Sequence, residues 1–227
     1  MAVQFVQPHR FSTDLYRRMT EIGMVPEDGT ELIDGVVVSG TRPYRFSSDD
    51  YIRLGTEGIL SRDDRVELVD GEIVEMSPIG PRHSKCVARL IELLTARRVR
   101  GAEVRVQDVL RLREGRTAHP DLGLYRLREG EFEDEQPTGR DALLVVEVAD
   151  SSLLYDRTVK MDDYAAAGVQ EYWVVDLRRN AVIVSRKPVA GQFMDVREHG
   201  AGETLQSSAV GDAGIAVDDI IGKRQPG

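Results

Sequence analysis

Two acidic residues stand where apolar strands are expected to begin and end. Asp121 follows Pro120 and opens a strand-like run, and Glu147 closes the apolar run of residues 143–146. A carboxylate buried alone at such a position is costly unless it is paired or bound to a cation. Mg²⁺ takes one or two carboxylates, a backbone carbonyl and water as ligands. The pattern therefore predicts a Mg²⁺ site at Asp121 and Glu147, with the backbone carbonyl of Val148 as a further ligand.

A lysine is placed to act on a phosphate held by such an ion. Lys160, Asp156 and Tyr164 share one face of an expected helix at i, i+4 spacing, and this helix begins close to the end of the Glu147 strand. Lys160 could orient or help deprotonate an attacking water, or stabilise the charge that develops on the phosphorus. The structural alternative is a surface ion pair with Asp156, worth only about a few tenths of a kcal/mol.

Two further residues are candidates for the phosphate or for the outer shell of the site. His83 lies one turn before Val87 on an inward helix face, close to a helix N-terminus that favours anions. Glu67 could add a third carboxylate from a hairpin. The structural alternatives are a hydrogen-bonded, half-buried histidine and a solvated hairpin acid. Asp121 and Glu147 have alternatives too, as a turn cap and an exposed strand end.

The elements that would position these residues follow an α/β order. Hydrophobic periodicity predicts, in chain order, a helix over 82–100, strands over 103–112, 122–127 and 142–148, a helix over 156–167, and strands over 171–176 and 181–186. The strand over 142–148 is nearly all apolar and is therefore expected to be central. An exposed acidic loop is expected over 130–139, and Gly168 suits the C-terminal end of the second helix. This order predicts an α/β fold with a mixed β-sheet flanked by helices.

An internal repeat precedes these elements. Phe11-Ser12 and residues 31–35 recur as Phe46-Ser47 and residues 67–71, so each copy is expected to form a short helix and a hairpin with an Asp-Gly turn. We interpret the repeat as a partial duplication that lengthens the N-terminal edge of the sheet. The predicted domains are an N-terminal extension over 1–43, a main domain over 44–190, and a C-terminal strand and tail over 191–227.

Composition restricts the class of protein. Among 227 residues, 30 are Lys or Arg and 39 are Asp or Glu, so a formal charge of −9 excludes the broad basic surface of an unspecific DNA-binding protein. Basic residues cluster locally over 82–89, 97–100 and 111–116, and the structural alternative for each cluster is a solvated face. Cys86 is the single cysteine, and no apolar span or leader pattern is present, so we expect a cytoplasmic protein without an internal disulfide.

A series of short motifs occurs in the order typical of a known family. In chain order the segments are Glu-Leu-Val-Asp-Gly-Glu-Ile-Val-Glu-Met-Ser-Pro at 67–78, Pro-Arg-His at 81–83, Pro-Asp-Leu at 120–122, Val-Val-Glu-Val-Ala-Asp-Ser-Ser at 145–152, Lys160, Tyr-Ala-Ala-Ala-Gly-Val at 164–169 and Glu-Tyr-Trp-Val-Val-Asp at 171–176. Over residues 44–190 the chain resembles the bacterial Uma-two family of restriction-endonuclease-like proteins, in the PD-(D/E)XK nuclease superfamily. The resemblance implies a restriction-endonuclease-like core, Mg²⁺- or Mn²⁺-dependent nuclease chemistry, and metal ligation by Asp121 and Glu147.

One position departs from the superfamily pattern. In the PD-(D/E)XK superfamily, the lysine normally stands two residues after the second acid, where this chain has Ala149. A lysine on the following helix is similar to what the Uma-two family shows, so we expect Lys160 to take this role. If Lys160 pointed to solvent, activity itself would be in doubt.

The expected function is a Mg²⁺-dependent endonuclease in which Asp121 and Glu147 hold the ion, Lys160 positions water, and His83 and Glu67 support the phosphate. DNA is the expected substrate, with RNA as an alternative. Other interpretations are an inactive nuclease-fold module that binds nucleic acid or protein, and a hydrolase of a small phosphodiester. A homodimer, common in the superfamily, would use the Trp173 strand or the duplicated segment. Neither zinc-finger spacing nor a helix-turn-helix signal is present to select a sequence.

Overall fold

The computed structural model describes residues 7–61, 63–127, 136–211 and 213–222, in two compact units. Unit 1 comprises residues up to 78 together with 113–118, and unit 2 comprises 79–112 and the residues from 119 onward. Most of the expected acidic loop over 130–139 falls outside the described residues. The predicted domain limits at residues 43 and 190 remain predictions. Within the described ranges, no helix is long and apolar enough to cross a membrane.

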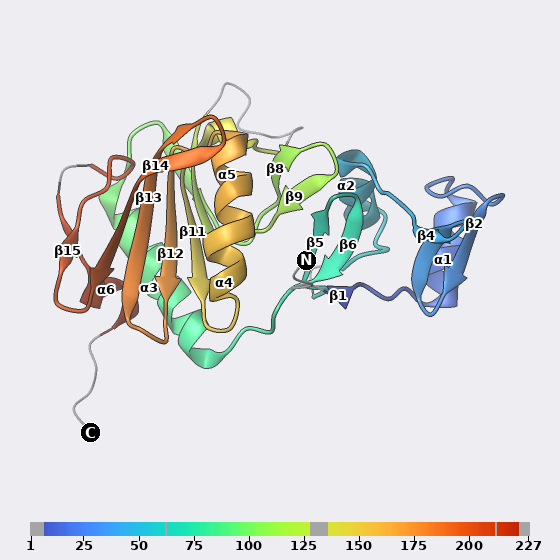
Figure 1. Ribbon diagram of the computed structural model, residues 1–227, viewed down its shortest axis with the longest axis horizontal. Coiled ribbons are helices and arrows are strands. Elements are labelled where there is room, and N and C mark those ends of the chain that lie inside the picture. Colours follow the sequence, from blue (N-terminus) through green and yellow to red (C-terminus); the bar gives the residue numbers. More distant parts are fainter. Residues whose placement is uncertain (1–6, 62, 128–135, 212, 223–227) are drawn as a thin grey trace. The chain divides into compact units, whose positions relative to one another are not determined.

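Unit 2 is built on a six-stranded mixed β-sheet (Figure 1). Its strands, in spatial order, are β14 (Gln192–Gly200), β13 (Ala181–Val189), β12 (Glu171–Asp176), β11 (Ala142–Ala149), β10 (Leu122–Arg126) and β7 (Ala102–Arg105). β11 and β12 are parallel, and the other neighbouring pairs are antiparallel. These two interior strands are nearly continuous apolar runs because both of their faces are buried. The expected α/β class with a central 142–148 strand is confirmed.

Helices cover both faces of this sheet (Figure 1). α3 (Pro81–Arg97) and α6 (Val217–Ile221) lie on one face, where their apolar side chains share a buried core with Val146 and Trp173. The other face carries one continuous helical segment, formed by α4 (Leu153–Tyr155), a π-helical turn (Asp156–Lys160) and α5 (Met161–Ala167). Gly168 ends this segment with a φ of 88°, as predicted. Both expected helices are confirmed, whereas the π-helical turn was not anticipated.

Two expectations about strands are wrong. The strand over 103–112 is interrupted, since Gln107 has a φ of 49° and donates its N–H to the carbonyl of Pro120. After the break, the chain forms the separate pair β8 (Leu110–Arg113) and β9 (Arg116–Ala118). The expected dimer contact through the Trp173 strand is also wrong, because β12 lies between β13 and β11 in the sheet and Trp173 is fully buried. β14 extends the sheet beyond residue 190, and the short strands β15 (Thr204–Leu205) and β16 (Ile215–Ala216) follow it.

Unit 1 contains the two repeat copies, and each copy forms the expected helix and hairpin. Copy 1 (residues 7–39) comprises β1 (Gln7–Pro8), α1 (Thr13–Glu21), β2 (Thr30–Ile33) and β3 (Val36–Ser39). Copy 2 (residues 42–75) comprises β4 (Arg42–Pro43), α2 (Ser48–Thr56), β5 (Val66–Val69) and β6 (Glu72–Glu75). The hairpins turn at Asp-Gly pairs in which both residues have positive φ, as this turn requires. The expected extension of the main sheet is wrong, because the strands form two separate three-stranded sheets.

A close backbone contact holds the C-terminal end of α5. Gly139 begins the 3-10 turn (Gly139–Asp141) that leads into β11, and a Cβ added there would lie 2.4 Å from the Cβ of Ala167. We expect Gly139→Ala to lower the free energy of unfolding by about 1–3 kcal/mol through overpacking, as measured by urea denaturation. Gly55→Ala is the control, since its Cβ would meet nothing within 4 Å on helix α2, and it should stabilise by about 0.5–1 kcal/mol. An unchanged free energy of unfolding for Gly139→Ala would contradict this packing.

Candidate functional site

The predicted acidic residues lie at the same end of two neighbouring strands. Asp121 immediately precedes β10, and Glu147 is near the end of β11, whose register sets Val146 opposite Leu122. Asp121 is 5% exposed and Glu147 is 4% exposed. Glu147 is therefore not the solvated strand end that the structural alternative required, and both carboxylates depend on partners within unit 2.

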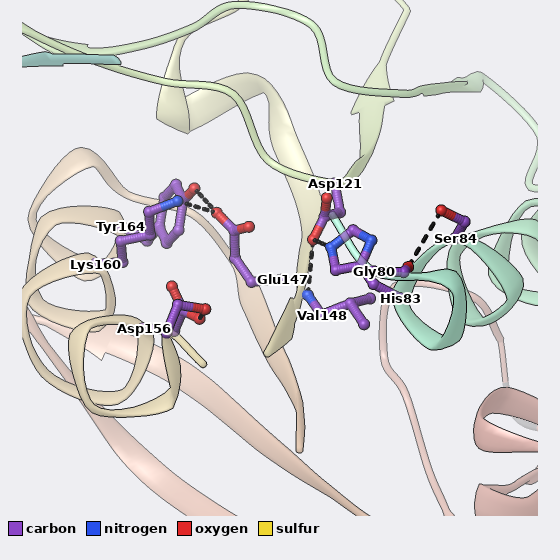
Figure 2. A network of polar contacts seen from close by, with 10 residues as sticks. Gly80, His83, Ser84, Asp121, Glu147, Val148, Asp156, Lys160 and Tyr164 are labelled. Carbon is purple, nitrogen blue, oxygen red and sulfur yellow. Dashed lines mark hydrogen bonds and ion pairs between the residues drawn. The ribbon is translucent and has the colours of Figure 1, made fainter. Parts of the chain in front are cut away.

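Asp121 is held by two groups from different elements (Figure 2). Its Oδ2 lies 2.9 Å from Nε2 of His83, in the first turn of α3, and accepts a hydrogen bond of 2.9 Å from the N–H of Val148. His83 is buried, and its Nδ1 has no hydrogen-bond partner among the described residues. Both contacts use Oδ2, so they orient the carboxylate and leave Oδ1 without a hydrogen bond to the described part of the chain.

The carbonyl of Val148 lacks the donor that a regular ladder would supply. Continuing the register of Leu122 with Val146 would set Pro120 opposite Val148, and proline has no N–H to donate. The N–H of Val148 is directed to Asp121 instead. Because the N–H and C=O of one strand residue point to the same side, the Val148 carbonyl is directed to the side of β11 on which Asp121 lies.

Glu147 accepts two hydrogen bonds from the helical segment on the other face of the sheet. Nζ of Lys160 and Oη of Tyr164 donate to its Oε1, at 2.9 Å and 2.6 Å (Figure 2). Lys160 is only 6% exposed, and Tyr164 is fully buried. The alternative placed Lys160 in a surface pair with Asp156, and this exposed location is wrong because both residues are buried. Lys160 is thus directed to the predicted second acid.

Tyr164 is the site residue to which the sequence reasoning assigned no role. The i, i+4 spacing with Lys160 was the signal that both side chains share one helix face. We expect Tyr164→Phe to lower the cleavage rate about tenfold and the free energy of unfolding by about 1–2 kcal/mol, since one hydrogen bond to the charged Glu147 is lost.

Tyr172→Phe is a matched control for this prediction, because Tyr172 is equally buried but its hydroxyl donates to the backbone carbonyl of Asp156. It should lose stability without a comparable loss of rate, and plasmid cleavage with urea denaturation separates the two effects. Equal loss of rate in both variants would mean that the hydroxyl of Tyr164 only supports packing.

Glu67 lies in β5 of unit 1 and is 4% exposed, so the alternative of a solvated hairpin acid is wrong. Burial, and to a lesser extent the charge of Glu67, raises the pKa of the neighbouring Tyr51 hydroxyl. The role of Glu67 as a third carboxylate remains a prediction, because it belongs to a different unit from Asp121 and Glu147.

Other chemically active groups of unit 2 have structural roles. Burial raises the pKa of the Cys86 thiol to about 12, so this group is protonated at neutral pH and does not serve as a nucleophile. The arginines of α3, which the sequence grouped into basic clusters, donate to backbone carbonyls of more C-terminal residues: Arg82 to Leu177, Arg89 to Ile221, and Arg97 to Ala213 and Gly214. These hydrogen bonds hold more C-terminal segments of the chain against α3.

The potential ligand groups of Asp121, Glu147 and Val148 fit Mg²⁺ better than structural Zn²⁺. Throughout the ranges that the structure describes, no three His, Cys, Asp or Glu side chains gather as a ligand group. Structural Zn²⁺ needs four protein ligands, whereas Mg²⁺ takes one or two carboxylates and keeps several waters. Two buried carboxylates and one backbone carbonyl without a ladder donor match the requirements of Mg²⁺.

Comparisons with known proteins agree with this architecture. A solved structure described as a putative nuclease belonging to DUF820, from Anabaena variabilis ATCC 29413, matches 76% of this chain and 96% of its own, with a TM-score of 0.63 and 14% identity. At that identity the likeness shows a shared fold. No curated protein matches the chain. Residues 48–218, well over half of the sequence, match the family Uma2, described as "Putative restriction endonuclease", and the chain therefore belongs to this family of nucleases.

Proposed function

We propose that the protein is a metal-dependent endonuclease that hydrolyses phosphodiester bonds of nucleic acid, with DNA as the substrate. The observation that supports this most strongly is the position of Lys160, whose buried Nζ lies 2.9 Å from Oε1 of Glu147. A PD-(D/E)XK site needs a lysine beside its second acid. Here the helix that follows β11 supplies that lysine in place of Ala149.

Asp121, Glu147 and the carbonyl of Val148 would hold Mg²⁺ or Mn²⁺. When bound, the cation would stabilise charge on the phosphoryl oxygens and lower the pKa of an attacking water. His83 and the N–H of Val148 restrain Asp121 through Oδ2, which keeps Oδ1 available as a ligand. Such preorganisation avoids the cost of ordering a carboxylate when the substrate arrives.

Lys160 and Tyr164 would act from the other face of the sheet. Their hydrogen bonds to Oε1 orient Glu147, and the ammonium of Lys160 would position the attacking water or neutralise charge at the phosphorus. His83 would support the site by holding Asp121 through Nε2, since its own Nδ1 is buried.

Plasmid cleavage tests this proposal. The full chain is incubated with supercoiled plasmid in Mg²⁺, in Mn²⁺ and in EDTA, and we expect nicked or linear products with either cation and none with EDTA. RNA and single-stranded DNA are tested in parallel to define the substrate. Intact substrates under every condition would refute the proposal, and salt-sensitive binding without cleavage would then favour an inactive nucleic-acid-binding module.

A further inference from the structure

The two repeat copies of unit 1 exchange strands reciprocally. β1 of copy 1 pairs with β6 of copy 2, and β4 of copy 2 pairs with β3 of copy 1. The registers of the two exchanges are equivalent, since Pro8 lies opposite Val74 and Pro43 lies opposite Val38. Each three-stranded sheet therefore contains two strands from one copy and one strand from the other.

The helices of the two copies repeat this exchange. Arg18 of α1 donates to the carbonyl of Glu57 at the end of α2, at 2.9 Å, and the equivalent Arg53 of α2 donates to the carbonyl of Ile22 at the end of α1, at 2.8 Å. Reciprocal contacts between equivalent residues define an isologous interface, which is the kind that relates two subunits of a symmetric dimer.

Equivalent apolar residues meet at the centre of this interface. The rings of Phe11 and Phe46 lie 6.4 Å apart, as equivalent residues near a twofold axis do. Met19 and its counterpart Leu54 are both fully buried, in one cluster that includes residues of both copies. Because the two copies share this core, each copy is one half of a folded unit.

We propose that copy 1 acts as a built-in partner subunit. It occupies, within one chain, the surface of copy 2 that would otherwise bind copy 2 of a second chain. The family match begins at residue 48, so copy 1 lies outside the part of the chain that the family model covers. The occupied surface makes the protein a monomer with one nuclease site.

Occupation of the copy 2 surface also determines the products of plasmid cleavage, which rests on the proposed function. A particle with one site cuts one strand in each encounter, so nicked circles accumulate before linear plasmid appears. A dimer with two sites would cut both strands and yield linear plasmid early. The mass of the particle, by contrast, is measured without any catalysis, so failure of the nuclease proposal and failure of this inference are distinguishable.

Sedimentation equilibrium of the full chain tests the inference. We expect the wild-type protein to have the mass of one chain, 25.3 kDa, at all concentrations up to about 100 μM. The double variant Phe11→Asp, Arg18→Asp removes the Phe11 ring, which lies near the twofold axis, and the hydrogen bond of Arg18 to copy 2. Copy 1 should then be released. The exposed copy 2 surfaces of two chains should pair, which would double the mass.

Arg17→Asp is the matched control, because Arg17 is exposed on the same helix and its ion pairs are with Asp14 and Glu21 of that helix. It should remain a monomer. A double variant whose copy 1 becomes sensitive to protease while the mass stays that of one chain would overturn the inference.

The wild-type measurement decides the matter even if the double variant fails to fold. A monomer supports the inference. A wild-type dimer that dissociates on Arg53→Asp would overturn it, because copy 2 would then bind a second chain. A wild-type dimer that is insensitive to Arg53→Asp would overturn the single-site claim, because the contact would lie elsewhere.

Discussion

Asp121→Asn is expected to lower the initial rate of plasmid cleavage by at least about three orders of magnitude. Asparagine has nearly the same shape and retains an oxygen that can accept from the N–H of Val148, but it lacks the negative charge that holds a divalent cation. Loss of the several kcal/mol that a bound ion contributes to the transition state corresponds to a loss of this size. Mn²⁺ binding, followed by electron paramagnetic resonance, should weaken in parallel.

Asp162→Asn is the matched control for this variant. Asp162 is exposed on α5, so the same chemical change there should leave both cleavage and Mn²⁺ binding at wild-type levels. Cleavage by Asp121→Asn within a few-fold of the wild type would place the metal at other ligands and refute the assignment of Asp121.

Lys160→Met is expected to lower the cleavage rate by about two to three orders of magnitude while Mn²⁺ binding is retained. Methionine preserves the apolar stem but removes the ammonium that would position water and neutralise charge, and removal of one such group typically costs this much. Binding persists because the ligands themselves are unchanged.

The same variant should lose stability in the absence of metal. Lys160 and Glu147 are both buried, so removal of the ammonium leaves a buried carboxylate without its ion-pair partner, at a cost of about 3–5 kcal/mol. Added Mg²⁺ should restore more stability to Lys160→Met than to the wild type, because the cation replaces the lost positive charge. Urea denaturation with and without Mg²⁺ measures this difference.

Lys187→Met is the control, since Lys187 is exposed on β13. It should match the wild type in cleavage rate and in the response of stability to Mg²⁺. If Lys160→Met cleaved plasmid as fast as Lys187→Met, the contact between Lys160 and Glu147 would be only a structural ion pair.

The two carboxylates are anchored to opposite helical layers. Asp121 is held by His83 of α3, whereas Glu147 is held by Lys160 and Tyr164 of the helical segment on the other face. Both layers must therefore pack on the sheet before the pair is positioned. Gly139→Ala, which disturbs the end of α5, should consequently reduce cleavage as well as stability.

Much of unit 2 could be predicted from the sequence because its elements are defined by local patterns. The apolar run of β11 indicated a central strand, the periodicity of α3 indicated an amphipathic helix, and Gly168 marked a helix end. The spacing of Lys160 and Tyr164 likewise indicated one helix face. Each of these patterns is contained within one element, so neighbouring residues determine it.

Packing between distant segments decided the remaining features. The contact of His83 with Asp121 joins residues 38 positions apart, and the hydrogen bond from the N–H of Val148 to Asp121 joins residues 27 positions apart. The break at Gln107 and the π-helical turn of Asp156–Lys160 are further features that local periodicity does not encode.

Asp121 and Glu147 illustrate the difference between what the sequence determined and what the tertiary structure decided. Residue type and spacing determined that Asp121 and Glu147 would lie at the ends of neighbouring strands. Only the tertiary structure decided that both are buried, which partners restrain each of them, and that Lys160 reaches Glu147 rather than solvent. The physical reason is that burial and hydrogen-bond partners belong to the packed elements together, whereas strand and helix patterns belong to each element alone.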